Sequence, residues 1–223
     1  HTSFNTPTTI TRASSLVTSI EVLTVDPEQQ QSLGEQMRHF TTDFLVHQPG
    51  FVSASVHRSW DGTHIINYIQ WDNDASFEQT RTNVTLQQHV SRLRTLALSV
   101  HQDLYDVVYT DDHTPLHVTT IAQEYDGDTF INVISTTPDQ QQGLVEFVIG
   151  NDAQVFAGAP GYRSANFHQS HDGTKVINYS HWDTSQDFLD AINKMFQVSH
   201  LTMEQANSLA TKIAGRQGQT DFR

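Results

Sequence analysis

The chain has 223 residues, no cysteine and a formal net charge of −13 at pH 7. The lack of cysteine excludes disulfides, thiolate nucleophiles, iron–sulfur clusters and zinc–thiolate sites. The acidic surface disfavours nucleic acid and anionic membranes as partners, and no apolar run approaches the length of a transmembrane helix. We therefore expect a cytoplasmic protein whose partners are small molecules.

Two stretches of the chain are nearly the same. "DGTHIINYIQWD" at 61–72 and "DGTKVINYSHWD" at 172–183 differ at four positions and lie 111 residues apart. The same offset links other pairs without a gap: Pro27 and Pro138, Gly50 and Gly161, Phe77 and Phe188, His89 and His200. A gapless offset of this length indicates a duplicated domain. We predict two domains, residues 1–112 (repeat 1) and residues 113–223 (repeat 2).

The first two elements of each repeat are a strand and a helix. Strands are predicted over 16–25 and 130–136 from their apolar, β-branched content. Each strand is followed by a capping residue, a proline and an acid, at 26–28 and 137–139, which is typical of a helix start. The helices are expected to end at the Pro-Gly pairs.

The next segment of repeat 1 alternates between apolar and polar residues. Residues 51–60 and 63–71 predict two strands joined by Asp61-Gly62 as a type I′ turn. This register places on one face Val52, Ala54, Val56, Ile65, Asn67, Ile69 and Trp71, and on the other Ser53, Ser55, His57, Ile66, Tyr68 and Gln70. The first face of repeat 2 holds Arg163, Ala165, Phe167, Val176, Asn178, Ser180 and Trp182.

A helical stretch up to residue 98 and a strand over 104–109 complete repeat 1. The order β-α-β-β-α-β is that of a ferredoxin-like domain, so the predicted fold class is α+β. The helices are expected to cover the face that carries Asn67 and Trp71. The more polar face suits a second sheet, and the two tandem domains are therefore predicted to form a pseudo-dimeric α+β barrel.

The end of repeat 2 differs from the end of repeat 1. The strand at 104–109 corresponds to "GRQGQT" at 215–220, which has no apolar residue. We predict that repeat 2 lacks a closing strand and leaves an exposed sheet edge. Either the segment 117–124 fills this edge or a second chain does. The first choice gives a monomer with an internal pseudo-dimer, and the second gives a homodimer.

The third strand of each repeat, with "INYIQWD" and "INYSHWD" followed by a phenylalanine helix, resembles the antibiotic biosynthesis monooxygenase family, whose members are dimeric α+β barrels. The Asn-x-x-x-Trp pair is similar to that of the cofactor-free anthrone oxygenases of aromatic polyketide pathways. This resemblance implies that Asn67, Trp71, Asn178 and Trp182 are catalytic. It also implies a small aromatic substrate, molecular oxygen, no cofactor and no metal.

The chain departs from the anthrone oxygenase pattern at two places. Phe77 and Phe188 stand where those oxygenases have a tyrosine. Their assisting arginine has no clear match, although Arg81, Arg92 and Arg94 lie nearby in repeat 1.

The two asparagines favour a cavity on physical grounds as well. An amide on an apolar sheet face costs about 1–3 kcal/mol unless it is hydrogen-bonded. A helix end or a buried water would satisfy it, and so would a substrate oxygen. We assign Asn67 and Asn178 as oxyanion donors and Trp71 and Trp182 as stacking walls; the alternative for the tryptophans is a purely structural core position.

The two predicted pockets differ in polarity. Repeat 1 has Val52 and Ile69 where repeat 2 has Arg163 and Ser180. We therefore expect repeat 1 to bind an apolar ring system more tightly.

Three functions remain open from the sequence. The leading one is a cofactor-independent monooxygenase that oxidises an electron-rich, planar phenolic polyketide with oxygen. A haem-degrading monooxygenase would need a histidine on the late helix, His89 or His200. A non-catalytic module that binds aromatic ligands is the third. His57 and His168 are expected to be polar residues of the barrel core rather than metal ligands, and no His-x-x-x-His pattern falls on a predicted helix.

Overall fold

The computed structural model describes residues 7–12, 15–122, 125–198, 213–214 and 218–222. Repeat 1 consists of β2 (Val17–Thr24), α1 (Pro27–Asp43), a 3-10 turn (Leu45–His47), β3 (Phe51–Ser59), β4 (His64–Trp71), α2 (Asp74–Arg81), α3 (Val84–Arg94) and β5 (Ser99–Asp112). Repeat 2 consists of β7 (Asp128–Ser135), α4 (Gln141–Asn151), a π-helical turn (Asp152–Phe156), β8 (Tyr162–Ser170), β9 (Lys175–Trp182), α5 (Ser185–Val198), β10 (Ile213–Ala214) and β11 (Gly218–Phe222).

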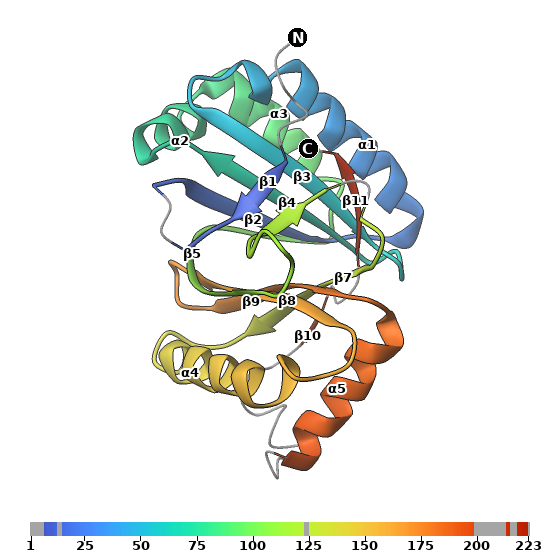
Figure 1. Cartoon of the computed structure of the whole chain (residues 1–223). Coiled ribbons are helices and arrows are strands. Elements are labelled where there is room, and N and C mark those ends of the chain that lie inside the picture. Colours follow the sequence, from blue (N-terminus) through green and yellow to red (C-terminus); the bar gives the residue numbers. More distant parts are fainter. Residues whose placement is uncertain (1–6, 13–14, 123–124, 199–212, 215–217, 223) are drawn as a thin grey trace.

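The strands form a closed barrel. Neighbouring strands run in the order β7-β11-β3-β4-β2-β5-β8-β9, and β9 pairs again with β7, so the ring has no gap. Figure 1 shows the strands in the middle of the molecule, with α1, α2 and α3 on one side and α4 and α5 on the other. The predicted pseudo-dimeric α+β barrel of two ferredoxin-like domains is confirmed. The domain boundary at residues 112 and 113 stays a prediction.

Each repeat contributes one strand that crosses to the other repeat. β5 pairs with β2 of its own repeat and with β8 of repeat 2. β11 pairs antiparallel with β3, placing Gly218 opposite Ser59. The prediction that repeat 2 lacks a closing strand is therefore wrong. Ladder hydrogen bonds come from the backbone, so a polar segment can satisfy the free N–H and C=O groups of an edge strand.

The segment 117–124, which was expected to pair with the exposed sheet edge, lies elsewhere in the structure. Its residues Thr119–Ile121 form β6, which pairs with β1 (Thr8–Ile10) in a separate two-stranded sheet. Ile10 and Ile121 are buried in the apolar cluster inside the barrel. The prediction for 117–124 is therefore wrong, because these isoleucines are buried in the barrel interior instead.

The residues of the β3–β4 hairpin lie on the predicted faces of the sheet, except at the start of β3. The register from Arg58 opposite Ile65 to Ala54 opposite Ile69 is confirmed. A bulge between Phe51 and Ser53 then places Phe51 opposite Trp71 and leaves Val52 38% exposed. Both predictions that put Val52 and its counterpart Arg163 on the helix-covered face are wrong.

The corresponding bulge in repeat 2 places Tyr162 opposite Trp182. Arg163 turns outward instead and forms ion pairs with Asp126 and Asp183.

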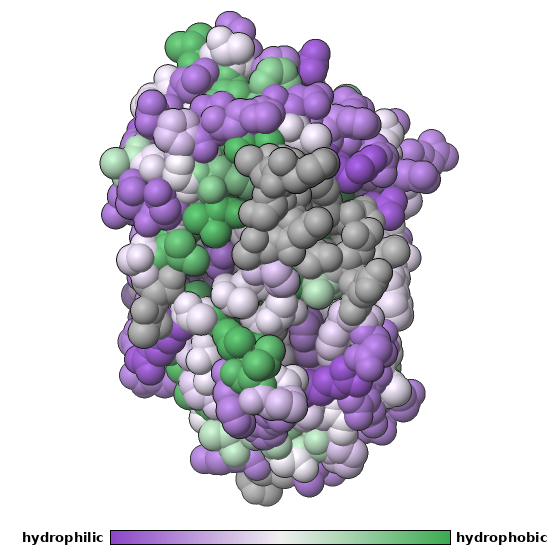
Figure 2. Space-filling view, turned by 45° about the horizontal axis from the view of Figure 1, so that its top comes forward, coloured by the Kyte–Doolittle hydropathy of each residue, from purple (hydrophilic) through white to green (hydrophobic). Residues whose placement is uncertain are grey.

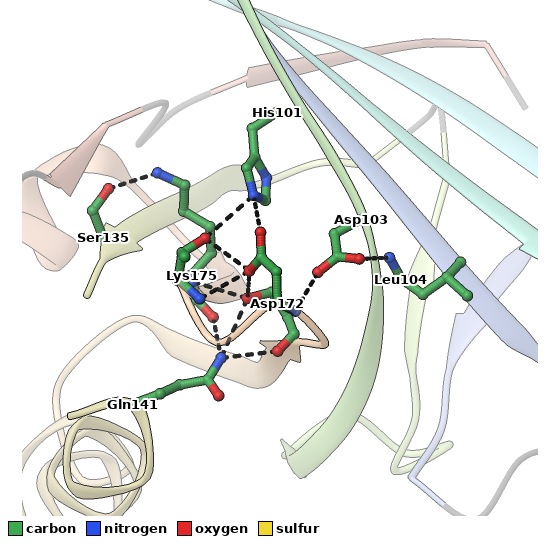
Figure 3. Close-up of polar contacts among 9 residues, drawn as sticks. His101, Asp103, Leu104, Ser135, Gln141, Asp172 and Lys175 are labelled. Carbon is green, nitrogen blue, oxygen red and sulfur yellow. Dashed lines mark hydrogen bonds and ion pairs between the residues drawn. The ribbon is translucent and has the colours of Figure 1, made fainter. Parts of the chain in front are cut away.

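The repeated Asp-Gly turn is a structural clamp. Gly62 and Gly173 have φ near +80°, but neither preceding aspartate does, so the turn is not type I′ as predicted. Asp172 Oδ1 instead accepts from the Thr174 N–H at 2.9 Å, and Gln141 Nε2 donates to two backbone carbonyls of the hairpin, those of Ser170 and Lys175 (Figure 3). Side-chain capping of the turn keeps the aspartate at negative φ.

Repeat 1 has the same clamp, with Asp61 capping the Thr63 N–H and Gln30 donating to the carbonyls of Ser59 and His64. In repeat 2, β5 adds two contacts: His101 Nε2 to Asp172 Oδ2 at 2.7 Å, and the Asp172 N–H to Asp103 Oδ2 at 2.7 Å (Figure 3). The Asp-Gly-Thr part of the repeated motif thus has a structural role, which is to hold the hairpin turn.

The two long helices begin differently. Asp26 Oδ1 accepts from the Glu28 N–H at 2.9 Å, so α1 begins at Pro27 as predicted. Thr137 Oγ1 instead donates to Asp139, so it caps no backbone N–H and α4 begins only at Gln141. The helix start predicted at 137–139 is therefore a few residues too early.

None of the described helices is long and apolar enough to span a membrane. On the face drawn in Figure 2, hydrophilic residues cover most of the surface and hydrophobic residues gather in smaller patches. This distribution accords with the large negative net charge.

Candidate active site

A cavity of about 370 Å³ lies in repeat 1, between the outer face of the sheet and the helices. β2, β4 and β5 contribute its floor, and α1, α2 and α3 contribute its walls. Its volume falls in the range of small-molecule sites, roughly 300–1,000 Å³. The apolar lining residues include Leu23, Met37, Phe40, Leu45, Ile69, Trp71, Phe77, Val90 and Leu93; the polar ones are Ser19, Glu21, Asn67, Thr80, Arg81, Gln87, Arg94 and Gln102.

Asn67 and Trp71, both on β4, line this cavity as the sequence predicts. Asn67 is 6% exposed, and within the described part of the chain its Oδ1 has no hydrogen-bond partner. Trp71 is 2% exposed, and the ring of Phe51 meets it edge-on at 5.7 Å. An amide oxygen left unpaired in an apolar cavity needs a partner, because an unsatisfied buried polar group costs about 1–3 kcal/mol.

A polar row crosses the cavity floor beside Asn67. Glu21 on β2 lies directly between Asn67 on β4 and Gln102 on β5. Arg94 of α3 donates to Glu21 Oε2 from Nε at 2.8 Å and from Nη2 at 2.6 Å. Gln102 donates to Ser19 Oγ at 3.1 Å. The site therefore combines an amide, an ion pair and an aromatic wall.

Sequence reasoning missed Glu21, Gln102 and Ser19. The signal for Glu21 was a charged residue inside an apolar strand, on the face that the helices cover. Arg81 and Arg94, named as neighbours from the sequence, both line the cavity, whereas Arg92 does not. Phe77 lines it at the position expected from the sequence.

The equivalent space in repeat 2 is an aromatic core. Phe130, which corresponds to Ser19, stacks on Phe188 with ring centroids 4.0 Å apart. Trp182 is 1% exposed, and three rings surround it edge-on, those of Phe156, Tyr162 and Phe188. In the described part of repeat 2, aromatic rings therefore lie around Trp182, and a phenylalanine takes the position of Ser19.

Asn178 is also satisfied within the protein. Its Oδ1 accepts a hydrogen bond from the backbone N–H of Asn166 at 3.3 Å. The structure thus brings Asn67 and Trp71 to a cavity and encloses Asn178 and Trp182 in a packed core.

The sequence matches the family described as antibiotic biosynthesis monooxygenase over residues 16–92 and 129–193. These two segments cover more than half of the chain, once in each repeat. The chain belongs to the antibiotic biosynthesis monooxygenase family. As a member of this family it is an enzyme of the monooxygenase class.

Two kinds of relative support this placement. Tetracenomycin-F1 monooxygenase of Streptomyces glaucescens is 37% identical over 89 residues, which are 40% of this chain and 80% of that protein. The crystal structure of an anthrone oxidase-like protein has the same fold, with a TM-score of 0.76 and 20% identity, over 96% of this chain and 94% of that one.

A structure of a major regulator of staphylococcal pathogenesis also shares the fold, with a TM-score of 0.52 and 12% identity over 92% of this chain and 99% of that one. The barrel therefore carries more than one function, and the function of this member of the antibiotic biosynthesis monooxygenase family is argued from its site.

The histidines named from the sequence lie inside the barrel of this monooxygenase. His57 Nε2 contacts the Tyr179 hydroxyl at 2.9 Å, and His168 Nε2 contacts the Tyr68 hydroxyl at 2.9 Å. Burial lowers the pKa of both imidazoles to about 4, so they are neutral at pH 7. Among the described residues no three His, Asp or Glu side chains cluster to hold a metal.

The described residues of repeat 1 do not fit the haem-degrading alternative. His89 packs against the Phe44 ring at 4.5 Å and is not among the residues that line the cavity. His200, the second candidate, lies outside the described residues. No histidine of the described part therefore faces the cavity as an axial ligand would.

Proposed function

We propose that this family member is a cofactor-independent monooxygenase that oxidises an electron-rich, planar phenolic aromatic of the anthrone type, a polyketide of antibiotic biosynthesis. The reaction takes place in the cavity of repeat 1. Its stoichiometry is one substrate CH₂ group and one O₂ converted into one ketone and one water.

The amide of Asn67, whose Oδ1 has no partner among the described residues, carries this proposal. A phenolic ketone offers both a hydroxyl that donates to Oδ1 and a carbonyl oxygen that accepts from the NH₂ group. Trp71 supplies a flat wall on the same strand. It lies four residues from Asn67, about 13 Å along the strand, and this distance suits a three-ring system.

The chemistry needs little from the protein. Triplet oxygen reacts slowly with closed-shell molecules, but an enolate or phenolate gives up an electron to it readily. Negative charge then develops on the substrate oxygen, and a positioned donor in a water-poor cavity stabilises that charge. Asn67 is the proposed donor. The names of the relatives, a tetracenomycin monooxygenase and an anthrone oxidase-like protein, support the same substrate class.

The test is oxygen uptake by the purified protein with a hydroxylated anthrone as substrate, in the presence of a metal chelator. We expect one O₂ consumed for each quinone formed. Asn67→Ala should lower kcat by about 100-fold or more, the cost of removing one oxyanion donor. Asn178→Ala is the matched control and should retain most of the activity. A stoichiometric flavin or haem spectrum would refute the cofactor-free part, and no uptake above the uncatalysed rate would refute the activity.

The proposed working form is a single chain. Each half of the barrel lends a strand to the other, and the ring closes within one molecule, which supports this form. Light scattering should give a mass near 25.2 kDa. A mass twice as large would favour the homodimer.

A further inference from the structure

The cavity of repeat 1 has a single carboxylate among its lining residues, that of Glu21. No histidine, aspartate, tyrosine or lysine of the described residues lines it. The other charged groups that face the cavity are the guanidinium groups of Arg94 on α3 and Arg81 on α2. Among the described lining residues, Glu21 is therefore the candidate for a group that takes a proton from a bound molecule.

The position of Glu21 suits that task. It is the cross-strand neighbour of Asn67, and such pairs have Cβ atoms about 4.5–5.5 Å apart. A ring system whose oxygen lies at Asn67 consequently has its adjacent ring edge beside Glu21. The side chain is only 14% exposed, so it sits in the cavity rather than in bulk water.

Arg94 holds this carboxylate in a fixed orientation. Both of its contacts go to Oε2, at 2.8 Å and 2.6 Å, so Oε1 is left for another partner. A paired guanidinium also stabilises the negative charge that moves from the carboxylate to the substrate when the proton is transferred.

Repeat 2 lacks the carboxylate altogether. The residue that corresponds to Glu21 is Asn132, and the one that corresponds to Ser19 is Phe130. Among the described residues, the carboxylate of Glu21 thus goes with the open cavity of repeat 1, and Asn132 goes with the aromatic packing of repeat 2.

We infer that Glu21 is the general base of the proposed monooxygenase, an assignment that rests on the proposed function. The Glu21 carboxylate takes one proton from the acidic CH₂ group, and the C–H electron pair stays on the substrate as an enolate whose oxygen contacts Asn67. The enolate reduces O₂ by one electron, and recombination forms the C–O bond of a peroxide anion. That anion takes the proton back from Glu21, and loss of water from the hydroperoxide gives the ketone.

The decisive experiment separates proton transfer from oxidation. Under argon and in D₂O, the protein is mixed with a hydroxylated anthrone, and exchange of the CH₂ protons is followed by NMR. The wild-type protein should accelerate this exchange, and Glu21→Gln should slow it by about 100-fold or more, in line with the usual contribution of a general base. Affinity for a hydroxylated anthraquinone, which has no such proton, should change only a few-fold.

The pH profile of oxygen uptake supplies the second readout. The Glu21→Gln rate should rise with pH as the substrate ionises in solution, and approach the wild-type rate where it is fully ionised. Glu21→Asp keeps a carboxylate and should retain the wild-type profile with a lower rate. Glu35→Gln breaks a surface ion pair with Arg38 on α1 and is the control that should change nothing.

Each outcome decides a separate point. Equal exchange rates in wild type and Glu21→Gln would overturn the assignment. A Glu21→Gln variant that loses quinone binding and keeps the wild-type pH profile would also overturn it, because that pattern belongs to a structural ion pair. Exchange that depends on Glu21 without oxygen uptake would refute the proposed oxidation and keep the base.

Discussion

The helix–sheet layers of the two repeats have the same asparagine and tryptophan on the third strand but use them differently. In repeat 1, Asn67 and Trp71 border a cavity of about 370 Å³. In repeat 2, Phe130 and Phe188 stack in the corresponding space, and Trp182 is enclosed by aromatic rings. The two repeats differ at the equivalent position of the first strand, which is Ser19 in repeat 1 and Phe130 in repeat 2.

The comparison separates what the fold requires from what a site requires. Both repeats keep the Asp-Gly clamp and the glutamine that binds it, because each hairpin needs them. Repeat 1 combines at one place an amide oxygen without a partner among the described residues, an ion pair and a cavity. A repeated motif is thus partly a folding element in both copies and a site in one of them.

The two tryptophans should differ most strongly in their effect on stability. Trp182→Ala leaves a large void among packed rings and should cost about 3–5 kcal/mol of the free energy of unfolding. Trp71→Ala enlarges a cavity that already exists, so fewer contacts are lost and the cost should be about half as large. Urea unfolding of both variants measures the difference. Equal losses would mean that the cavity of repeat 1 is closed in solution.

A phenylalanine at position 19 should fill the cavity of repeat 1. Ser19→Phe places a ring where Phe130 lies in repeat 2, and should weaken binding of a hydroxylated anthraquinone by about 100-fold, which is about 2.7 kcal/mol. The extra ring enters empty space, but the variant loses the hydrogen bond from Gln102 to Ser19 Oγ, so stability should fall by about 1 kcal/mol. Fluorescence titration measures the affinity. Unchanged affinity would place the ligand outside this cavity.

The sequence predicted the fold well because the evidence for it was local. The 111-residue offset, the period-2 alternation and the Pro-Gly corners determine the elements and the hairpin register. The closing strand β11 was missed because a ladder of backbone hydrogen bonds leaves little trace in "GRQGQT". The bulges at Val52 and Arg163 were missed because a one-residue shift in strand pairing leaves no mark in the sequence.

The site was only half predictable. Asn67 and Trp71 follow from register, because a polar residue on an apolar face is visible in the sequence. The aromatic packing of repeat 2 is not visible in the sequence, because it depends on which long-range neighbours, such as Phe130 and Phe156, pack near Trp182. Glu21 lies on a different strand from Asn67, and only the sheet order β4-β2-β5 brings them together.

A buried carboxyl group makes a third difference between the repeats. Asp152 in repeat 2 corresponds to Thr41 in repeat 1 and is fully buried, with Oδ2 accepting from the hydroxyls of Tyr109 and Tyr162. Burial raises the pKa of Asp152 from 3.8 to about 6, with the tyrosine hydrogen bonds acting in the opposite direction.

Because the folded-state pKa is raised, the stability that this group contributes is fully present below pH 4 and is lost as the pH rises through about 6. Asp152→Asn cannot ionise, so it should lack this loss and be about 2 kcal/mol more stable than wild type at pH 8, relative to their difference at pH 4. Urea unfolding from pH 4 to pH 8 tests this, with the exposed Asp190→Asn as control. Parallel pH curves for wild type and Asp152→Asn would contradict the burial effect.

The two asparagines should show the smallest difference in stability, and its direction is informative. Asn178→Ala removes the acceptor of the Asn166 N–H and should cost about 1 kcal/mol or somewhat more. Asn67→Ala removes an amide whose oxygen has no partner in the described part of the chain, so the variant should be as stable as wild type or slightly more stable. Thermal and urea unfolding without ligand measure both. A residue that lowers stability while supporting turnover is expected at a functional site, whereas a loss of stability in Asn67→Ala equal to that in Asn178→Ala would show that both asparagines serve the fold.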